Sequence, residues 1–223
     1  MDNLKNKLLD KLLFPARLYE KLSDRKATLA AGIVLVGVID FFLPDVMYII
    51  KKLFFGKTLF DIIYNAGMAV LVLLLLGFID VICMSVPLFD ISVYLKRKEA
   101  QFIMNTGIGA KEQQPALDPS AIKVMKAYIM SHFIMVPVSI IFNYVLSLDV
   151  FGENPAFLQT LAGILFIVIM IWSAAIMTRG INSLFRFSIL FRRLVFMIVF
   201  AWNSLFGMVF DIMIVDWLMR LFR

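Results

Sequence analysis

The chain has 223 residues, of which 62% are hydrophobic and 17% are charged, and its formal net charge is +6. This composition is too apolar for a soluble domain to bury in a single core. The excess of Lys and Arg does not indicate nucleic-acid binding, because that function needs a basic soluble domain that the sequence lacks. The sequence therefore predicts an integral membrane protein with no nucleic acid among its partners.

The N-terminal segment, residues 1–27, carries Lys and Arg throughout and lacks the cleavage site of a signal peptide. Leu4, Leu8 and Leu12 recur at helical spacing against basic residues, which predicts a cytoplasmic amphipathic helix. A second short helix is expected to start at Pro15. Two roles stay open for this segment: it lies in the interface beside anionic headgroups, or it packs on the cytoplasmic ends of the helix bundle.

The remainder, residues 28–223, supplies about five apolar stretches of the length that crosses a bilayer. The second stretch is far longer than the others, so it is expected to tilt strongly or to bend at Pro87. The only sizeable polar stretch, at about 96–123, is expected to be a cytoplasmic loop. The predicted spans cover residues 27–50, 58–95, 126–148, 155–177 and 194–218. The fold class is therefore all-α: a polytopic membrane bundle of about five transmembrane helices with an N-terminal amphipathic helix.

The positive charges predict the orientation of this bundle. With five spans, seventeen of the 22 Lys and Arg residues fall on the side of the N-terminal segment and five fall on the opposite side. Loops rich in Lys and Arg stay in the cytoplasm. The N-terminus is therefore expected to be cytoplasmic and the C-terminus external.

The reactive side chains are few. Cys83 is the single cysteine, so an intramolecular disulfide and a cysteine zinc cage are excluded, and it is interpreted as a small apolar residue of the second span. His132 is the only histidine, and no zinc-protease, Ser-His-Asp or paired-Glu motif surrounds it. The sequence therefore predicts a protein that is not an enzyme, with no catalytic residue, cofactor or metal site.

Polar residues form stripes along the predicted spans when they are plotted at 100° per residue. The third span carries one narrow stripe and the fifth span another, and the two acids of the first and second spans share faces with glycine or proline. These faces are expected to point into the bundle. The candidate residues for an intramembrane ligand or for helix packing are Asp40, Asp80, His132, Asn143, Asn203 and Asp211.

Two interpretations of these stripes stay open. A charged Asp at the membrane centre costs about 2.5 to 3.5 kcal/mol on insertion scales, so each acid needs a partner, a proton or water. In the first interpretation, small and hydrogen-bonding residues hold the helices together without any ligand. In the second, Asp40, Asp80, Asp211 and His132 line a cavity for a proton, a cation or a small solute.

The layout of the chain resembles one known family. The segment FPARLYEKLSDRK leads into the first of five spans, a short hydrophilic loop follows the second, and the chain ends almost at the last span. Over residues 14–218 this layout is similar to the Yip1 domain family. Eukaryotic members carry DLYGP before the spans, whereas this chain has only LYEKL, so the Rab-linked role of the family is carried over to no residue. The missing long cytoplasmic tail looks more like the bacterial branch, which implies the bacterial cytoplasmic membrane.

The resemblance implies a non-enzymatic scaffold or adaptor for membrane organisation or trafficking-type partner binding. Its expected partners are the lipid bilayer, through anionic headgroups at the cytoplasmic face, and a membrane protein or a second copy of the chain. The alternative function is a transporter or permease subunit that uses its buried Asp residues to pass a proton, a cation or a solute.

Overall fold

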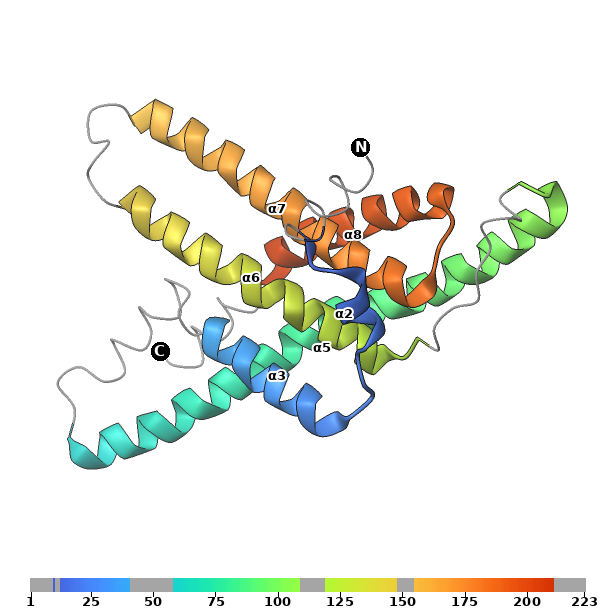
Figure 1. Ribbon diagram of the computed structural model, residues 1–223. Helices are drawn as coiled ribbons and strands as arrows, with labels where there is room; N and C mark the ends of the chain where they lie inside the picture. The colour runs from blue at the N-terminus through green and yellow to red at the C-terminus, as the bar shows by residue number, and fades with distance from the viewer. Residues whose placement is uncertain (1–9, 11–12, 41–57, 109–118, 148–154, 211–223) are drawn as a thin grey trace.

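The computed structural model describes residues 10, 13–40, 58–108, 119–147 and 155–210, and every regular element in these residues is a helix. The described part of the chain therefore confirms the all-α fold class. Figure 1 shows α5 running across the whole molecule, with α3 and α6 crossing it near its middle. The helices are α2 (Ala16–Glu20), α3 (Lys26–Asp40), α5 (Leu59–Thr106), α6 (Ala121–Ser147), α7 (Pro155–Phe185) and α8 (Ile189–Val209).

Three of the described helices are long and apolar enough to cross a membrane. The qualifying stretches are Ala66–Thr106 in α5, Thr160–Phe185 in α7 and Ile189–Gly207 in α8. They confirm that the chain is a helical membrane protein. The five-span count stays a prediction, because residues 41–57, 148–154 and 211–223 lie outside the described part of the chain.

Helix α5 differs from the expectation at its C-terminal end. It contains 48 residues, so it is about 72 Å long, more than twice the thickness of the hydrocarbon core. The basic run Lys96–Lys98 was expected to end the span and open a loop, but residues 96–106 continue the same helix. The run and the three residues after it, KRKEAQ, are all good helix formers, so the helix persists where the hydropathy falls.

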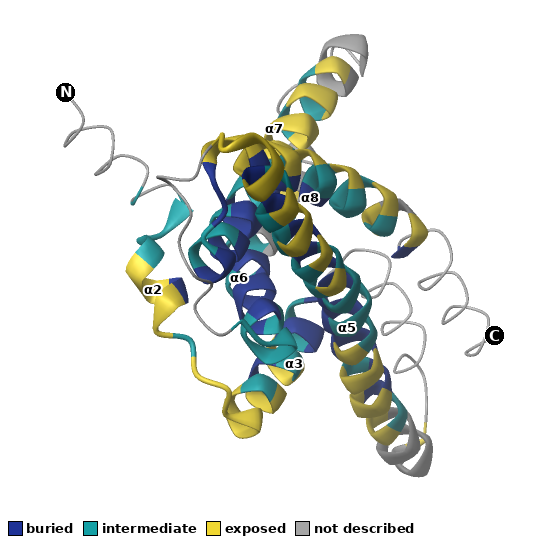
Figure 2. Cartoon of the chain, turned by 90° about the vertical axis from the view of Figure 1, so that its right-hand side faces the viewer, coloured by how far each residue is buried: buried dark blue, intermediate teal, exposed yellow. Residues whose placement is uncertain are grey.

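Among the described helices, α3 and α5 approach each other closely enough for backbone contact. A Cβ atom built at Gly37 would collide with the carbonyl oxygen of Leu73, and one built at Gly77 would collide with the carbonyl oxygen of Ile33. The two backbones therefore touch directly, which requires the absence of a side chain at both glycines. Helix α6 packs against both α3 and α5 and completes a three-helix group. Figure 2 shows buried residues concentrated on α6 and on the turns of α5 beside it.

The short helix α2 begins after Pro15, as predicted, and packs on the bundle through α7. The Tyr19 side chain is fully buried, and its hydroxyl lies 3.5 Å from the carbonyl oxygen of Ile176. For Ala16–Glu20 the structure therefore shows packing against the bundle. The amphipathic helix predicted before it falls almost entirely on residues 1–12, most of which lie outside the described part of the chain.

Candidate intramembrane site

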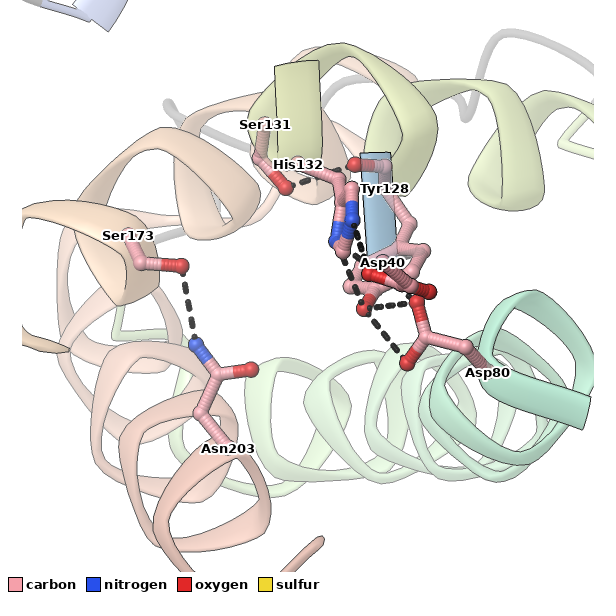
Figure 3. A network of polar contacts seen from close by, with 7 residues as sticks. All are labelled: Asp40, Asp80, Tyr128, Ser131, His132, Ser173 and Asn203. Carbon is pink, nitrogen blue, oxygen red and sulfur yellow. Dashed lines mark hydrogen bonds and ion pairs between the residues drawn. The ribbon is translucent and has the colours of Figure 1, made fainter. Parts of the chain in front are cut away.

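Three helices bring four polar side chains together in the interior. Asp40 comes from α3, Asp80 from α5, and Tyr128 and His132 from α6, and their side chains point toward one another in Figure 3. Asp40 is only 2% exposed, Asp80 5% and His132 9%. The sequence stripes predicted that these faces point inward, and the structure shows further that all four residues belong to one cluster.

The two glycines at the α3–α5 contact explain why the two acids meet. Asp40 follows Gly37 by three residues, and Asp80 follows Gly77 by three residues, in the similar segments GVID and GFID. Residues three apart lie on neighbouring parts of one helix face. Since Gly37 and Gly77 lie at the same crossing, the acid that follows each glycine is carried to the same side of that crossing.

Hydrogen bonds link the four side chains into a chain. The Tyr128 hydroxyl donates to the Asp80 carboxylate, at 2.7 Å from Oδ2 and 2.9 Å from Oδ1. The same hydroxyl oxygen lies 3.3 Å from Nδ1 of His132, and Nε2 of His132 lies 2.9 Å from Oδ1 of Asp40. The chain therefore runs from Asp40 through His132 and Tyr128 to Asp80.

The number of protons in this chain follows from its donors. If Asp80 is ionised, the single proton of the Tyr128 hydroxyl goes to its carboxylate, and the hydroxyl oxygen then accepts from a protonated Nδ1 of His132. The remaining proton lies between Nε2 of His132 and Oδ1 of Asp40, on either atom. In both arrangements the Asp40–His132 pair is neutral overall. Asp80 then leaves the cluster with one negative charge.

One oxygen of the cluster has no partner. The Oδ2 atom of Asp40 is buried and accepts no hydrogen bond from any residue that the structure describes. A buried carboxylate oxygen in that state attracts a proton or a metal ion. Asp40, Asp80 and His132 each offer one ligand atom, and these atoms lie within 4.8 Å of one another. Ligands of a tetrahedral transition metal lie roughly 3.5 Å apart, so these three side chains would have to move closer together to hold a divalent ion.

The other predicted site residues do not join this cluster. Asn203 of α8 donates from Nδ2 to Oγ of Ser173 on α7 at 3.2 Å, apart from the four residues, as Figure 3 shows. Asn143 lies in α6, but the structure does not describe its side chain, and Asp211 lies outside the described residues. The six candidates are therefore divided between one site, one helix–helix hydrogen bond and two positions that stay predictions.

A second buried polar group joins α5 to the start of α8, and the sequence analysis missed it. Oε1 of Glu99, which is 1% exposed, accepts from the backbone N–H of Ser188 at 2.6 Å, and its Oε2 accepts from Nζ of Lys96 at 2.7 Å. Nζ of Lys96 also donates to the carbonyl oxygen of Arg186 at 2.9 Å. Lys96 and Glu99 are three residues apart in the run KRKE, a spacing that indicates one helix face.

A more exposed polar group joins the segment before α3 to the start of α6. The Ser120 hydroxyl donates to the carboxylate of Asp24, and Nζ of Lys123 lies 3.3 Å from that carboxylate. The hydrogen bond from Ser120 is the main cause that holds the pKa of Asp24 below its usual range, and the charge of Lys123 adds to it.

No family model, no curated protein and no solved structure matches this chain. The resemblance to the Yip1 domain family therefore has no support from a family match and stays a prediction. The function must be inferred from the geometry of the chain itself.

Proposed function

We propose that the cluster of Asp40, Asp80, Tyr128 and His132 binds and releases a proton, and that the protein uses this step as a transporter or permease subunit. One observation carries the proposal: three different helices place two carboxylates, an imidazole and a phenol in contact inside the membrane bundle. Ionisable residues are costly in that environment, and those that persist there mark proton and ion pathways.

The charge of the cluster supports proton binding. With Asp80 ionised the cluster carries one negative charge, which is unfavourable in the interior of a membrane protein. One added proton, accepted on Asp80 or on the unpartnered Oδ2 of Asp40, makes the cluster neutral. The cluster therefore has two states that differ by one positive charge, which is the requirement for coupling to a proton gradient.

The continuity of the cluster supports proton transfer within it. Each donor lies between 2.7 and 3.3 Å from the next acceptor, from Asp80 through Tyr128 and His132 to Asp40. A proton can pass along such a chain by exchange between neighbouring groups, without movement of the backbone. Proton transfer would then link a site on α5 to one on α3.

Infrared difference spectroscopy on the reconstituted protein tests the proposal. A change of pH should produce a band of a protonated carboxyl group in the wild type, and Asp80→Asn and Asp40→Asn should each remove or shift it. Asp90→Asn changes an exposed acid of the same helix α5, so it should leave the band unchanged. Identical difference spectra for the wild type, Asp40→Asn and Asp80→Asn would contradict proton binding at the cluster.

A metal titration separates the proton from a divalent cation. Zn²⁺ and Mn²⁺ should bind no more tightly to the wild type than to His132→Gln when measured by calorimetry. Binding of either ion that is lost in His132→Gln and in Asp40→Asn would show instead that the cluster is a metal site.

The second candidate is the scaffold or adaptor role, whose proposed partners are anionic headgroups, a membrane protein or a second copy of the chain. The observation that favours it is the backbone contact at Gly37 and Gly77, because polar residues beside such contacts also hold helices together. In this case Asp40→Asn keeps hydrogen bonding and removes a charge, so stability should hold or rise with no change in the response to pH. The two candidates therefore predict opposite results for one variant.

For the localisation we propose the cytoplasmic membrane of a bacterium, with the N-terminus inside and the C-terminus outside. Support comes from the unequal distribution of Lys and Arg. In a Cys83→Ala background, single cysteines at Lys111 and Asn182 should be protected from an impermeant reagent in intact cells. Cysteines at Gly152 and Arg223 should be labelled. Labelling of Lys111 and Arg223 from the same side would contradict five spans.

A further inference from the structure

A pocket lies where the end of α7, the start of α8 and α2 meet, away from the intramembrane cluster. Its volume is about 550 Å³, and α7 contributes more lining residues than any other helix. Three arginines line it: Arg179 and Arg186 at the end of α7, and Arg192 in α8. The sequence predicts that this end of the bundle faces the cytoplasm.

The wall of the pocket holds buried polar atoms without partners. Oγ1 of Thr178, Nε of Arg179 and Oδ1 of Asn182 are all buried, and none has a hydrogen-bond partner in the described part of the chain. The Thr178 side chain is more than nine-tenths buried, since the residue is 6% exposed. These residues account for three of the six such atoms found among the described residues. Buried polar groups are normally paired, so the concentration of such atoms beside this pocket favours a polar ligand.

Arg186 has a backbone conformation that favours glycine. Its φ angle is 52°, and its N–H bonds to the carbonyl oxygen of Asn182 at 2.9 Å, which is the usual end of a helix with a left-handed residue. An arginine is disfavoured there relative to glycine. Its side chain lines the pocket, so a ligand for the guanidinium gives a reason for an arginine at this position.

The charges around the pocket favour an anion. Arg179 forms an ion pair with Asp10 through Nη2, whereas Arg186 and Arg192 form no ion pair with any residue that the structure describes. One acid, Glu20 of α2, also lines the pocket and is exposed. Nε of Arg192 donates to the carbonyl oxygen of Phe187 at 2.7 Å, so Arg192 offers its two terminal nitrogens and Arg186 its guanidinium to an anionic group, and one carboxylate opposes them.

We propose that this pocket binds a phosphate group that carries a neighbouring hydroxyl, held by Arg186, Arg192 and Arg179. Arginine is the residue best suited to phosphate, because its planar fork donates two parallel hydrogen bonds. Oδ1 of Asn182 is an acceptor and cannot bind a phosphate oxygen, so it needs a hydroxyl donor on the same ligand. The Thr178 hydroxyl can donate either to the phosphate or to the hydroxyl oxygen of the ligand.

Two kinds of molecule in a cell carry a phosphate beside a hydroxyl group. The headgroup of phosphatidylglycerol joins a phosphate to a glycerol that carries hydroxyl groups, and glycerol phosphate offers the same groups in solution. Basic pockets between membrane helices at the cytoplasmic side bind anionic lipid headgroups. The site is separate from the proton cluster, so the two proposals can fail independently.

Ligand-induced thermal stabilisation of the full chain in detergent tests the proposal. Short-chain phosphatidylglycerol and glycerol phosphate are added in separate arms, with short-chain phosphatidylcholine as the zwitterionic control. The chain has three Trp residues, whose fluorescence reports unfolding. We expect at least one of the two phosphoglycerol ligands to raise the melting temperature by several degrees, and phosphatidylcholine to have a smaller effect. The arm that gives the larger shift identifies the source.

Arg186→Gly is the decisive variant, because it removes the guanidinium and relieves the left-handed backbone. It should weaken binding at least about tenfold, the effect of losing a charge-assisted hydrogen bond, without lowering the melting temperature of the ligand-free protein. Glu20→Gln should tighten binding, since it removes the opposing charge. Arg193→Gln is the matched control, because Arg193 adjoins Arg192 but does not line this pocket. Equal binding by Arg186→Gly and Arg193→Gln, or no shift with either phosphoglycerol ligand, would overturn the proposal.

Discussion

The group of α3, α5 and α6 differs from the pair of α7 and α8 in what it buries. In the most apolar stretch of α5, 39% of the residues are buried, against 17% in α7 and 11% in α8. The first group encloses two acids, a histidine and a tyrosine. The second joins its helices through one amide–hydroxyl hydrogen bond, between Asn203 and Ser173. The cluster of two acids and a histidine therefore lies where three helices supply partners together, whereas the hydrogen bond between Asn203 and Ser173 joins two neutral side chains.

The largest expected effect comes from a substitution at the contact between α3 and α5. Gly77→Ala places a methyl group against the backbone of α3, so it should reduce the free energy of unfolding by about 2 to 3 kcal/mol. Gly163→Ala in α7 is the matched control, because no described atom lies within 4 Å of its Cβ position. Gly163→Ala should stabilise the protein by up to about 1 kcal/mol, because alanine favours the helix more than glycine does. Unfolding of both variants in detergent compares the two regions, and equal stability would contradict the α3–α5 contact.

A smaller effect is expected when the polar cluster loses one donor. Tyr128→Phe leaves the buried carboxylate of Asp80 without the hydroxyl that donates to it, which should cost about 1 to 3 kcal/mol. Tyr94→Phe removes a hydroxyl from a residue that is 59% exposed in the same helix group and should have little effect. A double-mutant cycle with Asp80→Asn should give a coupling energy between positions 80 and 128. Strict additivity would contradict the bond.

A smaller loss of stability is expected from a substitution between α7 and α8. Asn203→Ala removes the hydrogen bond to Ser173 and should cost about 0.6 kcal/mol, the average for such bonds in membrane helices. The cycle with Ser173→Ala isolates this energy. A coupling larger than that between Tyr128 and Asp80 would reverse the proposed difference between the two regions.

The smallest expected effect concerns the exposed group at Asp24, outside both regions. Its pKa is lowered in the folded state, so its contribution to stability is fully present above the unfolded pKa of about 3.9. The contribution is lost as the pH falls through the lower folded pKa. Asp24→Asn should therefore make the stability less dependent on pH below about 4, by a small amount because the group is exposed. Asp90→Asn serves as a control, and an unchanged acid slope in Asp24→Asn would contradict the shift.

The sequence predicted much of the framework. The apolar stretches located the α5, α7 and α8 helices, since membrane length and apolar composition act on each helix separately. The helical stripes predicted that Asp40, Asp80 and His132 face inward, because a charge facing lipid is too costly. The end of α5 was predicted poorly, since hydropathy reports the membrane boundary and not the end of the helix.

The pairing of the site residues could not be read from the stripes. A stripe gives the direction of each side chain on its own helix, but which residues meet depends on where the helices cross. The signal that was available is the repeated Gly-x-Ile-Asp in GVID and GFID, where glycine marks the close contact and the acid follows on the same face. Tyr128 precedes His132 by four residues and so shares its helix face, but its bond to Asp80 needed the position of α5.

The length of α5 has a mechanical consequence. Asp80 and Glu99 lie in this one helix, nineteen residues and about 28 Å apart along its axis. If Asp80 acts as the pivot, a tilt of α5 by about 5° displaces Glu99 by about 2.5 Å, which is enough to break its hydrogen bond to Ser188. Pro87 lies between them and removes one backbone hydrogen bond, so it is the point in this lever where bending costs least. Helix α5 therefore connects the cluster around Asp80 to the start of α8 through a single helix with one expected point of bending, at Pro87.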